Sequence, residues 1–442
     1  MRFMIYILAI FSIVVARGDN FSNLELVNRG VETPRSEIVP YDLDGFFEDG
    51  EKMETLYVKP IEAWTQQGES FTTHVTAPFK WLGRQQYLRL HGVAAAYSVA
   101  VNGVEIAKVM DGSALTEVDI TKALQRDQSN TISVTLDRNS PTKVVEAWSV
   151  GANAKSPIGE AYIFSQPTQM VRDIAIECER VGDVINTQVK ISVKSHALNT
   201  RTSTIFCELT RESGEILASV HNTITQSMRG EESFLLNAKI PVEEAWNIKS
   251  PNFLLLQIKV QHEGRNTEFQ TYSIGVRDAR VSESGDLLIN GQAVKAVAKH
   301  IPHNFDPEQI YDLKNEGVNT IIVGAGGYNR ALYDACDREG IYVITTAPIN
   351  SSGSPQSLAK GGNPSNDPQW RVAYEQRVER HIATTKVHPS VVAYAIGESS
   401  FNGYNLYESY LKAKELAGSR AVVYLNAKGE WNSDKLNLNI KK

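Results

Sequence analysis

Cysteine is scarce in this sequence, and its spacing argues against the common metal sites. Only Cys178, Cys207 and Cys336 occur among 442 residues, and neither CxxC nor CxxH is present. Zinc and iron–sulfur centres usually need such spacings, so we predict no metal and no cofactor. Cys178 and Cys207 could pair inside one domain, which the sequence alone does not fix. Cys336 shares an apolar helical face with Leu332 and Tyr333 and is predicted to lie in a core.

Basic clusters and long apolar runs are equally scarce. The net charge is −6, and no basic run is interleaved with aromatic residues, which argues against nucleic acid as a partner. The longest apolar run starts the chain, where Arg2 precedes about a dozen apolar residues and small residues surround Ala16. This run is too short for a comfortable membrane span. We therefore predict a signal peptide over residues 1–18, and a secreted or periplasmic mature chain without a membrane span.

Two β-rich segments follow the predicted signal peptide. Residues 19–165 contain short apolar runs separated by turn residues, and Asn102-Gly103 between two alternating runs is a strong hairpin signal. Several strands without a long helix predict a jelly roll. Residues 166–277 continue the alternation of apolar and polar residues in roughly seven runs, which predicts an immunoglobulin-like β-sandwich.

The pattern changes in residues 278–442. Short, continuously apolar runs such as NTIIVGAG, IYVITTA and VVAYAIG now alternate with helical stretches, among them WRVAYEQRVERHIATT. This order is typical of parallel strands with helices outside. We therefore predict a partial (β/α) barrel of the TIM type, which makes the chain a multidomain β plus α/β protein.

Motifs in all three segments resemble those of the β-galactosidase, β-glucuronidase and β-mannosidase family, glycoside hydrolase family two. They include YLRLHGVAAAYSVAVNGVEIAK and DITKAL in the first segment and DLLINGQAVKAVAKH at the entry to the third. The stretches LYDACDREGIYVI and HPSVVAYAIG are specific when they occur in this order. The resemblance implies a jelly-roll sugar-binding-like domain, an immunoglobulin-like sandwich and a TIM barrel, and it implies carbohydrate as the ligand.

The catalytic motif departs from the family pattern. The family's acid/base is the glutamate of G-N-E after the fourth barrel strand. In an ungapped alignment Gly397 matches the glycine, Glu398 takes the asparagine place and Ser399 takes the glutamate place. Successive side chains at a strand end point in different directions, so a carboxylate moved by one residue would face elsewhere. Deleting one residue from the alignment would restore Glu398, which stays the candidate acid/base.

Other positions that the resemblance assigns to the sugar site are also changed. The family's arginine and histidine after the second strand correspond here to Ile322 and Ala325, and its acidic run after the third strand is replaced by TTAPIN. Four residues are candidates for substrate binding. They are Ser399 and Asn402 near the mouth, and Glu146 and Trp148 in a segment that resembles one reaching toward the mouth in the family.

The resemblance places the nucleophile after the seventh barrel strand, whereas we count five or six strands in this sequence. We therefore expect a truncated barrel without a nucleophile. Such a sheet would have open edges and an uncovered apolar face, which invite a protein partner or self-association. There are two alternatives. The edge of the sheet could be shielded by the neighbouring sandwich and by the charged tail that ends in Lys441 and Lys442, or the chain could be a fragment of a longer gene product.

Three hypotheses for function follow. The favoured one is a secreted relative of glycoside hydrolase family two that has lost hydrolysis and keeps a carbohydrate-binding or scaffolding role. The second is an active retaining β-glycosidase that uses Glu398 as acid/base with a non-standard or partner-supplied nucleophile. The third is a purely structural protein-interaction module.

Overall fold

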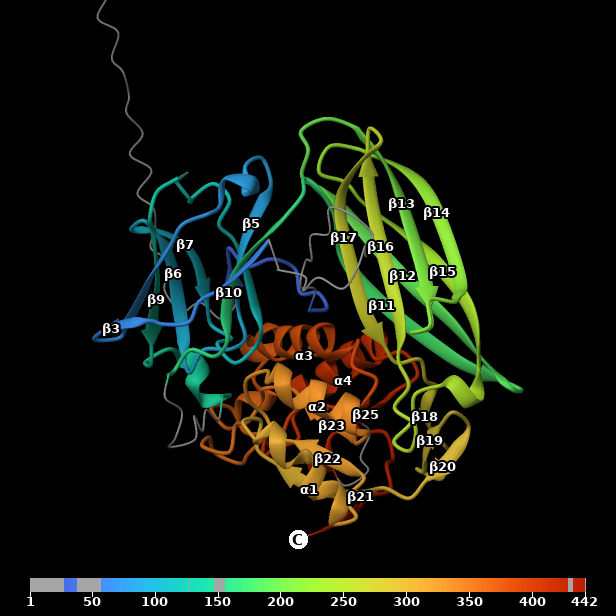
Figure 1. The fold of residues 1–442 in the computed structure, drawn as a ribbon. Helices are drawn as coiled ribbons and strands as arrows, with labels where there is room; N and C mark the ends of the chain where they lie inside the picture. The colour runs from blue at the N-terminus through green and yellow to red at the C-terminus, as the bar shows by residue number, and fades with distance from the viewer. Residues whose placement is uncertain (1–27, 38–56, 126, 147–155, 428–431, 442) are drawn as a thin grey trace, which may run out of the picture.

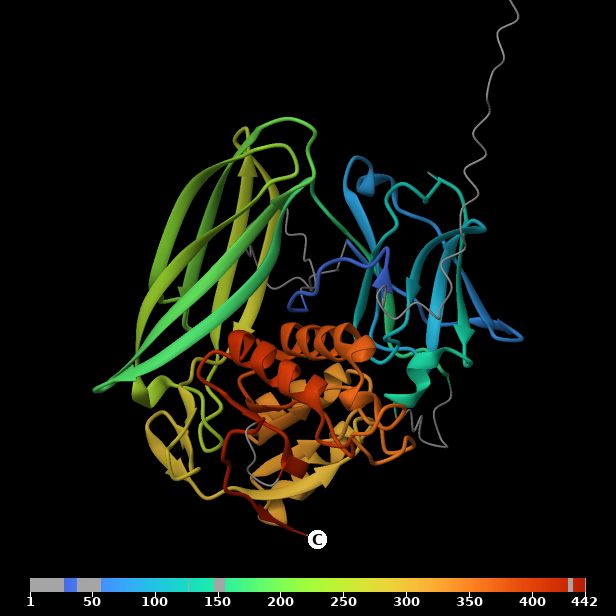
Figure 2. The same cartoon turned by 180° about the vertical axis from the view of Figure 1, so that it is seen from behind.

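Two antiparallel sandwiches stand side by side above a parallel sheet and its helices (Figure 1). The computed structural model describes residues 28–37, 57–125, 127–146, 156–427 and 432–441. The predicted signal peptide, residues 1–18, lies outside them. Seen from behind in Figure 2, helix α3 (Arg371–Thr385) runs directly beneath the two sandwiches. None of the helices among the described residues has the length and apolar character that a bilayer crossing requires.

The first sandwich consists of a six-stranded sheet in the order β1-β7-β6-β9-β4-β3 and a four-stranded sheet in the order β2-β10-β5-β8. The predicted turn at Asn102-Gly103 joins β6 to β7, and both residues have positive φ, 50° and 79°. The strands are β1 (Asn28–Arg29), β2 (Val58–Pro60), β3 (Thr65–Gln67), β4 (Ser70–Val75), β5 (Gln85–Leu90), β6 (Ala96–Val101), β7 (Val104–Val109), β8 (Thr116–Asp119), β9 (Asn130–Asp137) and β10 (Ala161–Gln166).

The second sandwich has seven strands, as the alternating pattern predicts. A three-stranded sheet, β11-β12-β15, faces a four-stranded sheet, β14-β13-β16-β17. In β12, β13, β15 and β16 buried residues alternate with more exposed ones, which is why period-2 alternation marks these strands in the sequence. Cys178 and Cys207 lie in opposite sheets as free thiols. The strands are β11 (Gln169–Val181), β12 (Val184–Ser195), β13 (Arg201–Thr210), β14 (Ile216–Gln226), β15 (Glu231–Pro241), β16 (Leu254–His262) and β17 (Arg265–Ile274).

The third unit is the predicted parallel sheet, in the order β25-β24-β23-β22-β21-β26. Strands β21 to β25 follow one another in sequence and in space, as in a (β/α) barrel, and the multidomain β plus α/β fold is confirmed. A short meander, β18 (Ala279–Val281), β19 (Leu287–Ile289) and β20 (Gln292–Val294), precedes it. The sheet and helices are β21 (Val297–Ile301), α1 (Ile310–Asn315), β22 (Thr320–Val323), α2 (Arg330–Glu339), β23 (Tyr342–Thr346), α3, β24 (Val391–Ala395), α4 (Tyr404–Leu416), β25 (Ala421–Val423) and β26 (Asn439–Ile440).

Residues 432–441, here called the C-terminal strap, cover the sheet that we expected to be open. At one edge Asp434 N donates to Val422 O, and Val422 N donates to Asp434 Oδ2, both at 2.8 Å. At the other edge β26 pairs in parallel with β21. Between the edges Leu436 and Leu438 pack on the small inner face of the sheet. The expectation of open edges and an uncovered face is therefore wrong, and the alternative of a sheet shielded by its own tail describes this arrangement.

Helix α3 joins the parallel sheet to the first sandwich through buried charges. The guanidinium of Arg377 contacts Glu146 at 2.7 Å and Asp111 at 3.5 Å, and none of the three side chains is more than 2% exposed. Arg380 from the next turn reaches Asp111 at 3.6 Å and donates to Thr116 Oγ1 at 2.7 Å. Buried charges need partners of opposite charge. Here α3 supplies the arginines, and the first sandwich supplies the carboxylates that they contact.

Candidate active site

Glu398 lies at the carboxyl end of the parallel sheet, three residues after β24. Its backbone N donates to Ile349 O at 2.9 Å, so the segments after β23 and β24 continue side by side beyond their strands. The side chain is half-buried, and Asn350 Nδ2 donates to Glu398 Oε1 at 3.3 Å. In (β/α) barrels the active site lies at the carboxyl ends of the strands. The structure thus brings one predicted residue, Glu398, to the expected mouth.

The carboxylate of Glu398 extends over the neighbouring strands. A Cβ atom built on Gly324, directly after β22, would lie 3.5 Å from Glu398 Oε2 and 3.4 Å from Ile301 O at the end of β21. Glycine at this position leaves the carboxylate uncovered by a side chain. Ile322 and Ala325, which stand where the family has polar residues, are 2% and 8% exposed and face apolar surroundings. The charged group at this mouth therefore comes from β24 and not from β22.

His300 and Thr346 are polar residues on the inner side of the sheet. His300 pairs in register with Ile322, and Thr346 pairs with Ala395. Both of these partners belong to the apolar cluster on the inner face, so His300 and Thr346 face the same way. His300 is exposed and Thr346 is buried. Asn350 ends the TTAPIN run, which the resemblance assigns to the sugar site, whereas His300 was not predicted there, although matching the strand ends by register would have indicated it.

The loop after Glu398 turns sharply and is held by hydrogen bonds to neighbouring segments. Ser399 is exposed and has a φ of 48°, in the left-handed region that non-glycine residues seldom adopt. Ser400 is buried, its carbonyl accepts from Tyr424 OH, and its Oγ accepts from Ser351 N at 3.0 Å. Asn402 accepts a hydrogen bond from Asn432 of the strap. Ser399 and Asn402 thus flank Glu398, and the strap contributes to holding the loop.

Glu398 is the one described carboxylate that directly follows a strand of the parallel sheet. A retaining glycosidase needs two carboxyl groups about 5–5.5 Å apart. The other acids described between residues 297 and 441 lie on or at the ends of helices, cap turns or belong to the strap: Asp306, Glu308, Asp312, Glu316, Asp334, Asp337, Glu339, Asp367, Glu375, Glu379, Glu408, Glu415 and Asp434. The described part of residues 297–441 therefore places one carboxylate, not two, at the mouth.

The two other candidates for substrate binding follow Val145, whose carbonyl accepts from Asn350 N at 2.8 Å. Glu146 is buried against Arg377 in the interface between the first sandwich and α3, with 2% of its side chain exposed. A carboxylate paired in this way holds two domains together and is closed to a ligand in this arrangement. Trp148 lies outside the described residues.

Asp334, Asp337 and His388 form the cluster whose oxygen and nitrogen atoms come close enough to share a cation. Both ring nitrogens of His388 are already engaged, Nδ1 with Asp337 Oδ2 at 2.6 Å and Nε2 with Tyr328 OH at 2.8 Å. Asp337 Oδ1 accepts from Ser390 N at 2.9 Å. Burial disfavours the charged imidazole, but Asp337 outweighs it and raises the pKa of His388. These contacts join α2 to the start of β24, which is a structural role.

Comparisons with known proteins agree with this architecture. Residues 299–442 match the family described as glycosyl hydrolases family 2, TIM barrel domain. A β-galactosidase of Priestia megaterium is 23% identical over 376 residues, covering 79% of this chain and 35% of the relative. A β-galactosidase of Clostridium acetobutylicum is also 23% identical, with 83% and 43% covered.

Solved structures show the same fold at lower identity. A glycosyl hydrolase family 2 member from Bacteroides cellulosilyticus superimposes with a TM-score of 0.66 at 17% identity, over 80% of this chain and 49% of that one. A Bacteroides uniformis β-glucuronidase gives a TM-score of 0.65 at 16% identity, with 80% and 46% covered. The chain thus spans between a third and a half of the length of these relatives. The matched barrel segment and the β-galactosidase relatives together support membership of glycoside hydrolase family 2.

Proposed function

We propose that this chain is an exported member of glycoside hydrolase family 2 that binds a carbohydrate at the barrel mouth without hydrolysing it. The observation that supports the proposal is Glu398, a single half-buried carboxylate with Asn350 as its donor and no second described carboxylate beside it. One carboxylate can accept hydrogen bonds from sugar hydroxyls. Cleavage with retention needs an acid and a nucleophile facing each other.

The chemistry of the mouth favours a neutral sugar. Glu398 carries the charge there, and a ligand carboxylate placed beside it would be repelled. Asn350 and His300 add a neutral amide and an imidazole that can pair with hydroxyl groups. The relatives are β-galactosidases, and structural neighbours include β-glucuronidases. Of these two classes of ligand, a β-galactoside fits the charge of the mouth better than a β-glucuronide.

Titration calorimetry with galactosides, mannosides and glucuronides tests this function. We expect galactoside or mannoside binding that Glu398→Ala weakens by about tenfold or more, because a charged hydrogen-bonding partner is lost. Glu415→Ala, which removes an exposed carboxylate from α4, is the matched control and should change binding little. Absence of binding to all three classes would overturn the proposal.

A working retaining glycosidase is the second candidate function. Glu398 is half-buried at the mouth, so its carboxylate can reach a ligand as an acid/base must. The chain spans only part of its relatives' length, and the remaining length of those relatives could carry a nucleophile. Aryl β-glycoside turnover by the purified chain decides between the two. We expect none; turnover that Glu398→Gln abolishes would establish the enzyme instead.

Export and association complete the proposal. N-terminal sequencing of the protein recovered outside the cytoplasm tests export. We expect the mature chain to start after residue 18. Self-association through the barrel edge would require the C-terminal strap to leave β21 and Val422. We therefore expect a monomer by light scattering, and a stable dimer would favour the interaction module.

A further inference from the structure

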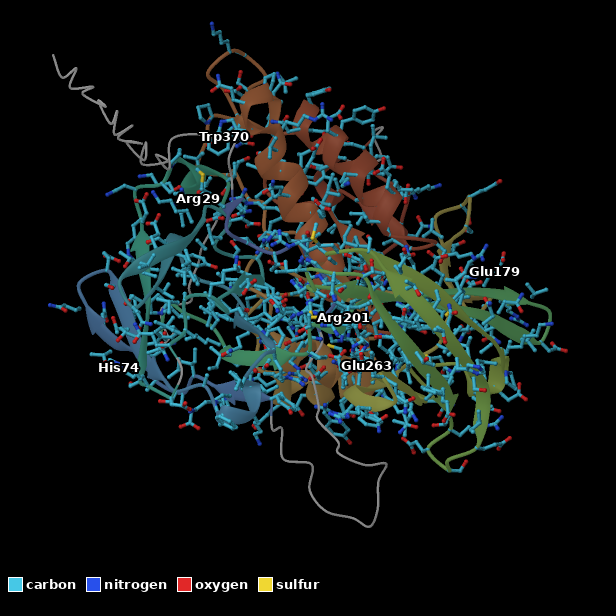
Figure 3. The ribbon with its side chains drawn as sticks, turned by 90° about the horizontal axis from the view of Figure 1, so that it is seen from above. Arg29, His74, Glu179, Arg201, Glu263 and Trp370 are labelled. Atoms are coloured by element: carbon cyan, nitrogen blue, oxygen red, sulfur yellow. The ribbon has the colours of Figure 1, made fainter. Side chains whose placement is uncertain are left out.

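A cavity of about 830 Å³ separates the second sandwich from the parallel-sheet unit. Strands β11, β12 and β15 line it on the sandwich side, and the loop from α4 to β25 lines it on the other. Figure 3 labels Glu179, a lining residue on the side of the sandwich away from the first one. Nothing in the proposed sugar site reaches this cavity, so it is a separate feature.

Basic side chains from both sides meet in this cavity. Arg280 is paired with Asp278 at 2.8 Å and with Glu179 at 3.1 Å. Lys386 is paired with Asp173. The acids Glu177 and Glu179 and the base Lys239 also line the cavity but are exposed to solvent. These groups have ordinary surface or ion-pair roles.

Arg277 and Arg420 differ, because no carboxylate contacts either of them in the described part of the chain. Arg277 Nη2 donates to the carbonyls of His388 and Val391. Arg420 donates to Ala417 O at 3.1 Å and Lys386 O at 3.0 Å. Each guanidinium therefore has a terminal nitrogen without an acceptor among the described residues. Both residues are 8% exposed and line the cavity.

Two neighbouring buried cations without a counter-charge are costly. Burial, followed by the charge of Arg420, lowers the pKa of Arg277 to about 10. Arg277 Nε is buried and has no hydrogen-bond acceptor. The carbonyl groups near the ends of α3 and α4 offset part of the charge, as helix C-termini do. Carbonyl dipoles orient the two guanidinium groups, but they add no net negative charge.

We propose that Arg277 and Arg420 form an oxyanion-binding site, which takes a phosphate, a sulfate or the carboxylate of an acidic sugar. Guanidinium groups match planar or tetrahedral oxyanions with paired N–H donors. The backbone contacts hold both side chains in place before the anion arrives. Because the ligand would sit between the second sandwich and the loop after α4, it would also fix the two units relative to each other.

Calorimetry with phosphate, sulfate and glucuronate, against chloride at equal ionic strength, tests the site. We expect at least one oxyanion to bind, and Arg420→Gln to weaken it by about tenfold or more. Arg280→Gln is the matched control, because Arg280 already has carboxylate partners, and it should stay within about twofold. Binding of phosphate alone identifies an inorganic anion, and binding of glucuronate alone identifies an acidic sugar. Equal binding in Arg420→Gln overturns the proposal.

A second measurement needs no variant and covers the case in which Arg420→Gln does not fold. Cys178 lines the same cavity and is half-buried, whereas Cys207 and Cys336 are fully buried. Alkylation of the folded protein should therefore report Cys178. A bound oxyanion should slow it several-fold by covering the thiol and disfavouring the thiolate. Unchanged alkylation in every oxyanion, with no heat of binding, would refute the site.

Discussion

Removing the apolar contacts of the C-terminal strap should loosen the parallel sheet. Leu436 and Leu438 are half-buried and pack on the inner face formed by residues such as Ala298 and Ala393. Leu436 also packs on a second apolar cluster around Trp246. The double change Leu436→Ala and Leu438→Ala keeps the backbone of the strap and removes what holds it on the sheet.

The size of the effect follows from the buried surface. Full burial of a leucine is worth about 1.5–3 kcal/mol, and a half-buried one about half of that. Two truncations with incomplete collapse around them should lower the free energy of unfolding by about 2–3 kcal/mol. For a unit of this size each kcal/mol moves the midpoint by about 2–4 °C, so we expect a decrease of about 4–12 °C.

Thermal unfolding followed by circular dichroism gives the midpoint, and hydrogen exchange shows where the loosening occurs. The amides of Asn439 and Lys441 donate to the carbonyls of Ala296 and Ala298 at 2.9 and 2.8 Å, so their protection reports strap docking. Leu411→Ala, on the exposed face of α4, is the control. If the double variant keeps both the protection and a midpoint within about 1 °C of the wild type, the strap does not hold the sheet.

Two further predictions concern the first sandwich and its neighbours. Arg377→Met should lower the free energy of unfolding in urea by about 3–5 kcal/mol, because it leaves Glu146 and Asp111 buried without this partner. The milder change Glu146→Gln serves as the comparison. Equal stability of Arg377→Met and the wild type would contradict this prediction. Burial opposes a charge on His91, but Glu37 and Glu160 together outweigh it and raise the pKa of His91 to about 9. This pKa lies above the unfolded value of about 6.5. The charged His91 therefore makes its full contribution to the free energy of unfolding below about pH 6.5, and this contribution disappears as the pH rises through about 9. In His91→Gln the thermal midpoint should therefore change less with pH over that range than in the wild type. An equal decline of the midpoint in both proteins would assign the loss of stability to other groups.

The elements of the fold were predictable because their patterns are local. Alternation identifies the seven strands of the second sandwich, and the apolar runs identify β22 to β24. Asn102-Gly103 fixes one hairpin by its own turn chemistry. The strap was not predictable in this way, since β26 has two residues and its pairing with β21 joins segments far apart in the chain. Its leucines acquire their role only when the sheet curls around them.

The candidate site was only partly predictable for the same reason. Glu398 follows an apolar run, which is a local signal for the mouth of a sheet. The donor Asn350 is 48 residues earlier in the chain and meets Glu398 because β23 and β24 are neighbours. Glu146 shows the same limit from the other side. Its segment resembles one that reaches toward the mouth in the family, but its carboxylate pairs with Arg377, 231 residues later in the chain, which no local pattern indicates.

The two most specific family motifs contact each other away from the mouth, and this explains why they indicate the barrel frame and not its chemistry. Asp337 of LYDACDREG accepts from Ser390 N and pairs with His388, both from HPSVVAYAIG. This buried network sets the packing of α2 against the start of β24, so changing any member would leave a buried polar group unpaired. At the other end of β24 the loop makes hydrogen bonds with Ser351, Tyr424 and Asn432, but Ser399 in this loop is exposed. Exposed loop residues can change with less loss of packing than buried ones. Motifs in the buried network are therefore evidence for the frame of the barrel.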